Sequence, residues 1–169
     1  MASMTSDEED VDEDTLRQKL DQLMICPHCR QDKPSTIKER FELLKRNAEQ
    51  RHWSWSYAIL GSFYESGQGT TVNEALAAKW YQRGAEAGFC DAQHEYGRCL
   101  SFGVGVKKVD MKQAIMWYEK AARSNYPPSV YKLGQILLQG FQGTRQDFPK
   151  AFQLLQQAAQ QGVTHGYES

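Results

Sequence analysis

The chain repeats itself at an interval of about 37 residues, and this interval constrains its fold more than any other feature. A glycine recurs at positions 61, 97 and 134, and a pair of bulky residues begins at positions 80, 117 and 154. A pair of small residues begins at positions 84, 121 and 158. Because three kinds of landmark keep one spacing over three copies, the sequence predicts a stack of similar units.

Each period predicts two helices that are joined by a turn containing glycine. The first helices are expected at about 56–66, 92–102 and 128–139, and the second helices at about 73–88, 110–124 and 147–161. Glycine tolerates positive φ, so glycines 67, 103 and 140 suit the ends of the first helices. The N-cap positions of the second helices hold Asn73, Asp110 and Asp147. The predicted fold class is all-α.

Small and aromatic residues predict how these helices pack. Glycine inside a helix costs about 1 kcal/mol relative to alanine, so its recurrence predicts that a neighbouring helix backbone approaches closely there. These glycines are Gly61, Gly97 and Gly134. Aromatic residues of the second helices are expected to fill the space between adjacent hairpins; they are Trp80, Tyr81, Trp117 and Tyr118. Their regular spacing favours core packing over a cofactor site.

These motifs resemble the Sel1-like repeat, a relative of the tetratricopeptide repeat. Residues 60–69 (LGSFYESGQG) match its first half, and residues 110–122 (DMKQAIMWYEKAA) match its second half. Residues 147–162 match too, with Leu154-Leu155 in place of the aromatic pair. The resemblance covers about residues 54–162. It implies a right-handed α-solenoid that serves as an adaptor or scaffold for protein complexes and has no catalytic residues.

The sequence divides into four regions. Residues 1–14 are expected to be a disordered acidic tail, and residues 15–53 to hold N-terminal helices with a CPHC turn. Three repeats are expected at 54–88, 89–125 and 126–162. Residues 163–169 are a C-terminal tail or the start of a truncated fourth repeat, so self-association through an uncapped last repeat is an open alternative.

One helix before the repeats is predicted at about 37–51. Thr36 and Glu39 have the spacing of a capping box at its start. An apolar stripe at helical spacing is formed by Ile37, Phe41, Leu44 and Ala48. We expect this stripe to pack on the first hairpin, as a half-repeat or an N-terminal cap. A further helix is plausible at about 12–24.

Charge and hydropathy narrow the class of partner. Residues 1–14 hold seven acidic residues and no Lys or Arg, which leaves 20 basic and 14 acidic residues in the rest of the chain. That balance is too mildly basic to favour nucleic-acid binding. The sequence has no apolar run of the length that a membrane span needs and no signal-peptide pattern, so we expect a cytoplasmic or nuclear protein.

The string Cys26-Pro27-His28-Cys29-Arg30 is the most specific local motif. Two cysteines at this spacing can bind one zinc ion, but a structural site needs four ligands. The string resembles the closing CPxCR of a RING finger, which would imply a ubiquitin-ligase component. Residues 1–25 contain no Cys or His, so a RING would be incomplete in this chain. Zinc at Cys26 and Cys29, shared with another chain, stays an alternative to a simple turn.

Known catalytic motifs do not occur in the sequence. There is no HExxH zinc motif, no GxSxG nucleophile motif, and no phosphate-binding or dinucleotide-binding loop. The run Gly103-Val104-Gly105-Val106 has counterparts in the other copies, so it is predicted to be a turn between helices. Cys99 shares its position with Phe63 and Ile136, which predicts a core residue. No cofactor is expected apart from the zinc alternative.

A protein or peptide partner is the remaining prediction. In stacked hairpins the first helices line a groove, and their positions near the glycine landmarks vary in polarity between copies. The candidate groove residues are Tyr57, Ser62, His94, Glu95, Arg98, Tyr131, Lys132 and Gln135. Glu95 and Arg98 have the spacing of an ion pair on one helix face. An ordinary solvated face is the alternative interpretation.

Overall fold

The computed structural model describes residues 34–50, 55–140 and 145–162. The chain divides into two compact units, Met1–Ser35 and Thr36–Ser169, and nearly all described residues belong to the second unit. The predictions for the acidic tail, for a helix at about 12–24, for the CPHC turn and for residues 163–169 lie outside the described residues.

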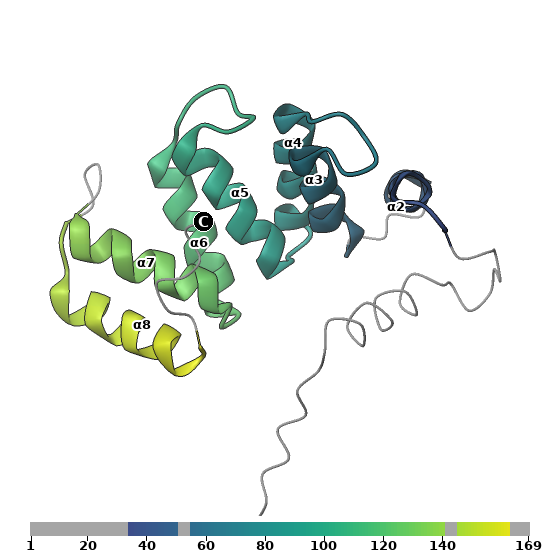
Figure 1. Ribbon diagram of the computed structural model, residues 1–169. Coiled ribbons are helices and arrows are strands. Elements are labelled where there is room, and N and C mark those ends of the chain that lie inside the picture. The colour runs from purple at the N-terminus through teal and green to yellow at the C-terminus, as the bar shows by residue number, and fades with distance from the viewer. Residues whose placement is uncertain (1–33, 51–54, 141–144, 163–169) are drawn as a thin grey trace, which may run out of the picture. The chain divides into compact units, whose positions relative to one another are not determined.

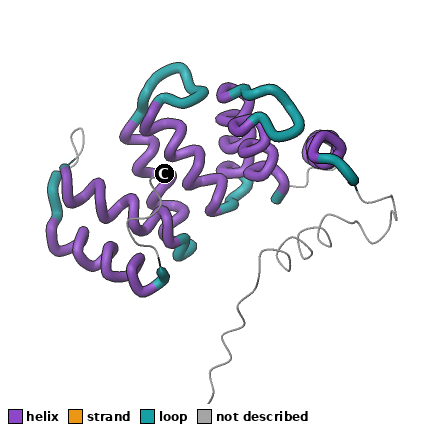
Figure 2. Tube along the Cα trace, in the orientation of Figure 1, coloured by secondary structure: helices purple, strands orange, loops and turns teal. Residues whose placement is uncertain are grey.

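Every regular element in the described ranges is a helix, and no strand occurs there (Figures 1 and 2). The helices are α2 (Ile37–Gln50), α3 (Ser56–Ser66), α4 (Glu74–Glu86), α5 (Cys90–Phe102), α6 (Met111–Arg123), α7 (Pro127–Gln139) and α8 (Phe148–Gln160). We call α3–α4 hairpin 1, α5–α6 hairpin 2 and α7–α8 hairpin 3. Each helix packs on the next along the chain, and α3 also contacts α5. This arrangement confirms the predicted all-α solenoid.

The N-caps of the second helices are confirmed. The side chains of Asn73, Asp110 and Asp147 accept hydrogen bonds from backbone N–H groups three residues later, at 3.0, 3.0 and 3.1 Å. The predicted capping box of α2 forms as well. The Glu39 N–H donates to Thr36 Oγ1 at 3.2 Å, and the Thr36 N–H donates to Glu39 Oε2 at 3.4 Å. Thr36 lies 37 residues before Asn73, so α2 keeps the interval of the repeats.

The turns connect each hairpin to the unit before it. Gly67, Gly103 and Gly140 end the first helices with φ of 71°, 76° and 67°, as expected. The next glycine of the turn, Gly69 or Gly105, lies against the backbone of the helix before the hairpin. A Cβ added at Gly69 would lie 2.7 Å from the Ile37 carbonyl oxygen, and one added at Gly105 would overlap the Glu74 carbonyl oxygen. Each of these turns therefore rests on the first residue of the preceding second helix.

Helix α2 consequently occupies the place of a second helix, which is the predicted half-repeat. The Phe41 ring lies 6.3 Å from the Phe63 ring and 5.2 Å from the Tyr64 ring of α3, between centroids. Leu44 and Ala48 are 1% exposed. The prediction was wrong for Ile37, which is 55% exposed. Its backbone carbonyl, rather than its side chain, faces the turn of hairpin 1.

The packing at the helix glycines also differs from the prediction. A Cβ at Gly61 would lie 2.6 Å from the Tyr81 ring, and one at Gly97 would lie 3.0 Å from the Tyr118 ring. At Gly134 the nearest atom, at 2.8 Å, belongs to the Leu155 side chain. In each case the nearest group is a side chain of the second helix in the same hairpin, and only at Gly134 is a backbone atom also among the three nearest, the Ala151 carbonyl oxygen at 3.3 Å.

The aromatic pairs likewise pack first within their own hairpins. The Trp80 ring lies 5.6 Å from that of Tyr57, and the Trp117 ring lies 5.7 Å from that of Tyr96. Tyr118 additionally joins hairpin 2 to hairpin 3, because it shares a buried cluster with Leu133 and Ile136. The expectation that these rings fill only the space between hairpins was therefore incomplete.

Candidate functional site

A groove of about 840 Å³ is lined by the first helices of the three hairpins. Two second-helix residues, Tyr81 and Tyr118, contribute to its floor. The remaining lining residues are Ala58, Ile59, Ser62, Glu65, Asp91, His94, Glu95, Arg98, Phe102, Tyr126, Pro128, Tyr131, Lys132 and Gln135. Aromatic rings and aliphatic side chains make up half of this lining, which also holds five charged residues, Glu65, Asp91, Glu95, Arg98 and Lys132.

Seven of the eight predicted groove residues line this groove: Ser62, His94, Glu95, Arg98, Tyr131, Lys132 and Gln135. The structure brings them together from three helices, α3, α5 and α7. Tyr57 does not belong to the set. Its side chain is 9% exposed and packs on Trp80, so it is a packing residue of hairpin 1. Whether the seven residues bind a partner stays a prediction.

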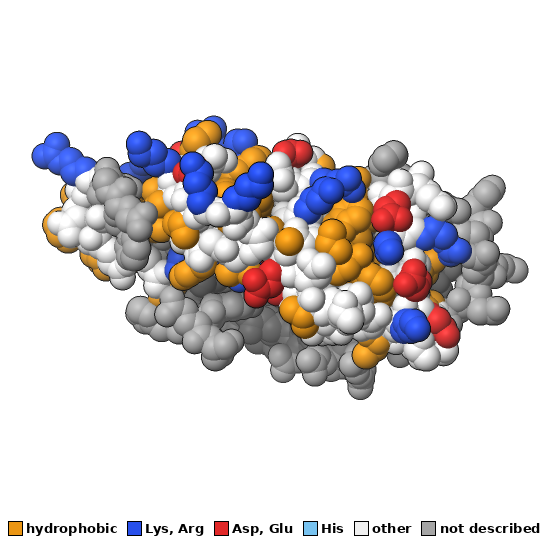
Figure 3. Space-filling model, turned by 90° about the horizontal axis from the view of Figure 1, so that it is seen from above, with side chains coloured by type: hydrophobic (Ala, Val, Ile, Leu, Met, Phe, Trp, Pro, Cys, Tyr) orange, Lys and Arg blue, Asp and Glu red, His pale blue; other side chains and the backbone are white. Residues whose placement is uncertain are grey.

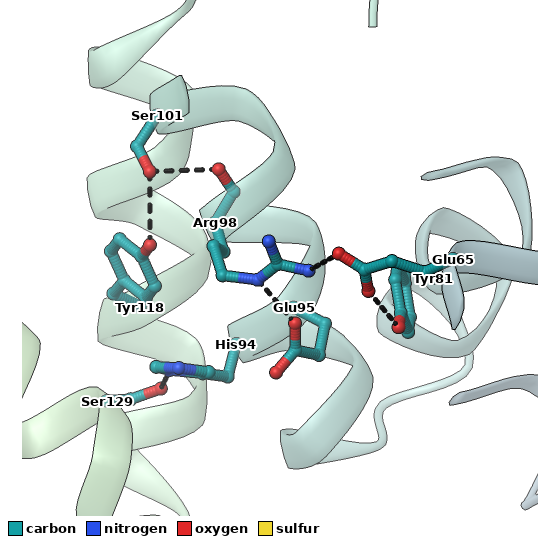
Figure 4. A network of polar contacts seen from close by, with 8 residues as sticks. All are labelled: Glu65, Tyr81, His94, Glu95, Arg98, Ser101, Tyr118 and Ser129. Carbon is teal, nitrogen blue, oxygen red and sulfur yellow. Dashed lines mark hydrogen bonds and ion pairs between the residues drawn. The ribbon is translucent and has the colours of Figure 1, made fainter. Parts of the chain in front are cut away.

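An ion-pair network fixes Arg98 in the middle of the groove (Figure 4). The predicted pair with Glu95 is confirmed, with 2.7 Å between Nε and Oε2. Arg98 also pairs through Nη2 with Glu65 of hairpin 1, and the Tyr81 hydroxyl donates to Glu65 Oε2 at 2.9 Å. The network therefore ties hairpin 1 to hairpin 2.

The protonation states of the network follow from its surroundings. Burial alone would lower the pKa of the Arg98 guanidinium, but the hydrogen bonds and charges of Glu95 and Glu65 outweigh burial and raise the pKa. Burial, followed by the hydrogen bond to Glu65, raises the pKa of Tyr81 far above its usual value. Arg98 therefore stays charged and Tyr81 stays a hydrogen-bond donor.

Sequence reasoning missed Glu65 and the rings of Tyr126 and Phe102. The signal for Glu65 was available, because Glu65 and Arg98 have opposite charge and lie on first helices of neighbouring copies. No such signal exists for Tyr126, which is the N-cap residue of α7 and precedes the helix. It enters the groove only because the turn from α6 brings it beside His94, with 5.7 Å between the rings.

His94 is the histidine of the groove and the residue to examine first as a general base. Its Nδ1 lies 2.9 Å from Ser129 Oγ, the distance expected for a serine nucleophile and its base. Ser129, however, is 0% exposed, so a substrate cannot reach its hydroxyl. Burial, helped by the charges of Arg98 and Lys132, lowers the pKa of His94 to about 4. The pair is a neutral packing contact between α5 and α7.

Metal-binding chemistry does not appear in the described part of the chain. Over residues 34–50, 55–140 and 145–162, no group of three or more His, Cys, Asp or Glu could hold a metal ion. Cys99 is 1% exposed and burial raises its pKa to about 11, which confirms the predicted core role. Cys26 and Cys29 lie outside the described residues, so zinc there stays a prediction. Among the described helices, none is long and apolar enough to cross a membrane.

The family follows from the repeats themselves. A family model described as the Sel1 repeat matches residues 56–89, 90–126 and 127–163. The chain belongs to the Sel1 repeat family. Sel1 repeat proteins are generally protein-interaction scaffolds and are typically non-catalytic.

Solved Sel1 structures have the same fold as this chain. A protective antigen of uropathogenic Escherichia coli strains that displays an SLR fold is 29% identical, with a TM-score of 0.68. A Sel1 repeat protein from Oxalobacter formigenes is also 29% identical, with a TM-score of 0.64. The matches cover 75% and 73% of this chain, but only 27% and 49% of those proteins. No curated protein matches this Sel1 chain.

Proposed function

We propose that the three Sel1 hairpins form a non-catalytic scaffold that holds a protein or peptide partner in the groove along α3, α5 and α7. The observation that carries this proposal is the lining of the groove. The rings of Tyr126, Tyr131 and Phe102 are at least partly exposed in a space of about 840 Å³, while the buried rings of Tyr81 and Tyr118 close its floor. This volume lies in the range of ligand-binding sites. Tyrosine rings offer large contact areas with a polar end, and they are enriched where proteins bind one another.

The groove is also arranged before a partner arrives. Arg98 is held by Glu95 and Glu65, and the Lys132 ammonium lies 5.6 Å from the centre of the Phe102 ring. Side chains that are already fixed lose little conformational entropy on binding, which favours affinity. A short helix or an extended segment with apolar side chains fits such a surface.

A test begins with peptides selected from a displayed library for binding to the full chain. Ser62 is exposed and lines the groove, so Ser62→Trp fills the groove without changing the core. Gln156→Trp, on an exposed position of α8, is the matched control. We expect Ser62→Trp to weaken the selected peptides at least tenfold in fluorescence anisotropy and the control to leave them unchanged. Equal affinity for both variants would contradict the groove assignment.

Self-association through α8 is a second candidate, and one observation favours it. Phe152 is 69% exposed, whereas the residue 74 positions earlier, Ala78, is 3% exposed because hairpin 2 covers it. An apolar side chain at a position that packs in hairpin 1 is suited to a second copy of the chain. Sedimentation equilibrium would show a dimer that Phe152→Ser removes; a chain that is monomeric at all concentrations would refute this candidate.

A further inference from the structure

We propose that the hollow between hairpin 1 and hairpin 2, on the side of the helix-joining turns, binds an acidic peptide segment. This hollow is separate from the groove and shares no lining residue with it. It has a volume of about 310 Å³ and lies between α4, α5 and the turn that precedes α6. This volume lies at the lower end of the range of binding sites, so the hollow has room for one or two side chains of a peptide.

The rim of the hollow is basic and its basic groups are not used by the fold. Lys79, Lys107 and Lys108 line it, and all three are exposed. None of the three makes a hydrogen bond or ion pair with another described residue. The only carboxylate in the lining, Asp110, already accepts two hydrogen bonds from Gln113, both at 3.0 Å. The hydrogen bond from the Gln113 N–H and, less strongly, the charge of Lys108 lower the pKa of Asp110. Since Asp110 forms no ion pair with the three ammonium groups, they can meet carboxylates of a partner.

The turn holds two of these lysines in a defined place. The Val104 N–H donates to the Cys99 carbonyl at 3.0 Å, and the Asp110 N–H donates to the Leu100 carbonyl at 2.9 Å. Between them, Gly105 lies so close to Glu74 that no side chain would fit. Because the turn is anchored at both ends and in the middle, little backbone entropy is lost when Lys107 and Lys108 contact a partner.

The other units of the chain show that this charge is not a requirement of the repeat. Lys79 corresponds to Glu42 in α2 and to Met116 in α6, at intervals of 37 residues. Lys108 corresponds to Thr71 in hairpin 1 and to Arg145 before α8, and Lys107 is an additional residue that the turn of hairpin 1 lacks. Since α2 and the turn of hairpin 1 fold without a lysine at the corresponding positions, packing does not explain the three lysines.

The floor of the hollow sets the second requirement for the partner. Tyr96, Leu100 and Val106 line it, so a peptide with an apolar side chain between acidic residues complements both the floor and the rim. Figure 3 looks down on the face that carries the turns, where basic side chains border hydrophobic patches and acidic side chains also occur. This mixed surface favours a short acidic peptide over a nucleic acid, which would need a continuous basic surface.

The experiment measures binding of fluorescent 12-residue peptides to the full chain at low salt. The test peptide alternates Asp and Glu around a central Leu, and the comparison peptide has Asn and Gln instead. In Lys79→Glu/Lys108→Thr the two lysines become the residues that lie 37 positions earlier, Glu42 of α2 and Thr71 of the hairpin 1 turn. In the control, Arg145→Thr/Lys150→Glu, the same net charge is lost at exposed residues elsewhere.

We expect the acidic peptide to bind at least tenfold more tightly than the neutral one, and Lys79→Glu/Lys108→Thr to abolish this preference. The control variant and the groove variant Ser62→Trp should retain it, which separates this proposal from the proposed function. The proposal would be overturned if both charge variants lost the preference for the acidic peptide equally. It would also be overturned if a single-stranded oligonucleotide bound as tightly as the acidic peptide. If the first variant unfolds, replacement of all three lysines by Gln gives the same comparison.

Discussion

At the scale of single residues, Gly61 and Gly97 show how one ring decides the distance between two helices. Each lies beneath a tyrosine of its own hairpin, and an added Cβ would lie 2.6 Å from Tyr81 but 3.0 Å from Tyr118. The sequence predicted that these glycines mark close packing. It could not show the packed group, because a side chain and a backbone leave the same pattern of glycines.

The two glycines should therefore respond differently to alanine. At Gly61 the ring of Tyr81 is held by Glu65 and cannot move aside, so overpacking should cost about 1–3 kcal/mol. At Gly97 a smaller clash is offset by the higher helix propensity of alanine. Urea unfolding should give Gly61→Ala the lower free energy of unfolding; equal values would show that the Tyr81 ring is not fixed.

His94 should make stability depend on pH. Its pKa is lowered to about 4 in the folded chain and is about 6.5 in an unfolded chain. The unfolded state therefore binds more protons between these values, and stability falls as the pH falls below about 6.5. Between pH 7 and pH 5 the loss from this residue should be about 2 kcal/mol. In urea unfolding, His94→Gln should lose less stability than the original chain between pH 7 and pH 5. An unchanged pH dependence in this variant would contradict the burial of His94.

At the scale of elements, the turns add backbone contacts to the helix packing that connects one hairpin to the next. Their glycines and the N-caps of the following helices could be predicted, because both depend on a few adjacent residues. The contact of Gly105 with Glu74 could not be predicted, because those residues are far apart in sequence. For the same reason the hollow beside that turn was not predicted, although its lysines are visible in the sequence.

Gly105→Ala and Gly88→Ala should separate backbone strain from loss of this contact. Both glycines have positive φ, of 66° and 97°, so alanine at either position costs about 1 kcal/mol or more. Nothing lies within 4 Å of a Cβ at Gly88, whereas a Cβ at Gly105 overlaps Glu74. Thermal unfolding should show a clearly larger decrease in midpoint temperature for Gly105→Ala than for Gly88→Ala. Equal decreases would mean that the turn can move away from α4.

At the scale of the described unit, each hairpin is stabilised mainly by its immediate neighbours. The three-copy interval predicted this arrangement and most helix bounds within two residues. The family model begins at residue 56, but the N-cap interval extends back to Thr36, and Phe41 of α2 packs on Tyr64 of α3. Because α2 lacks the glycine and aromatic landmarks, sequence reasoning could describe it only as a half-repeat or a cap.

Destabilisation of α2 should therefore remain local. Phe41 is 4% exposed, and Phe41→Ala should cost about 3–5 kcal/mol in the unit that contains it. In a solenoid the effect decreases with each interface that it crosses. Hydrogen exchange should accelerate in α2 and α3 and change little in α7 and α8. Uniform acceleration along the described helices, α2 to α8, would show that the unit unfolds as one cooperative body.

The close contact of the turn glycines Gly69 and Gly105 with the preceding helix has a consequence for recombination. Because the Gly69 and Gly105 contacts use backbone atoms of Ile37 and Glu74, they depend little on which side chains those helices carry. A hairpin could then be exchanged for one from a relative, with its groove surface, provided that this glycine, the N-cap and the side chains that join neighbouring hairpins, such as Tyr118, are kept. New specificities would then arise by exchange of whole hairpins between related proteins.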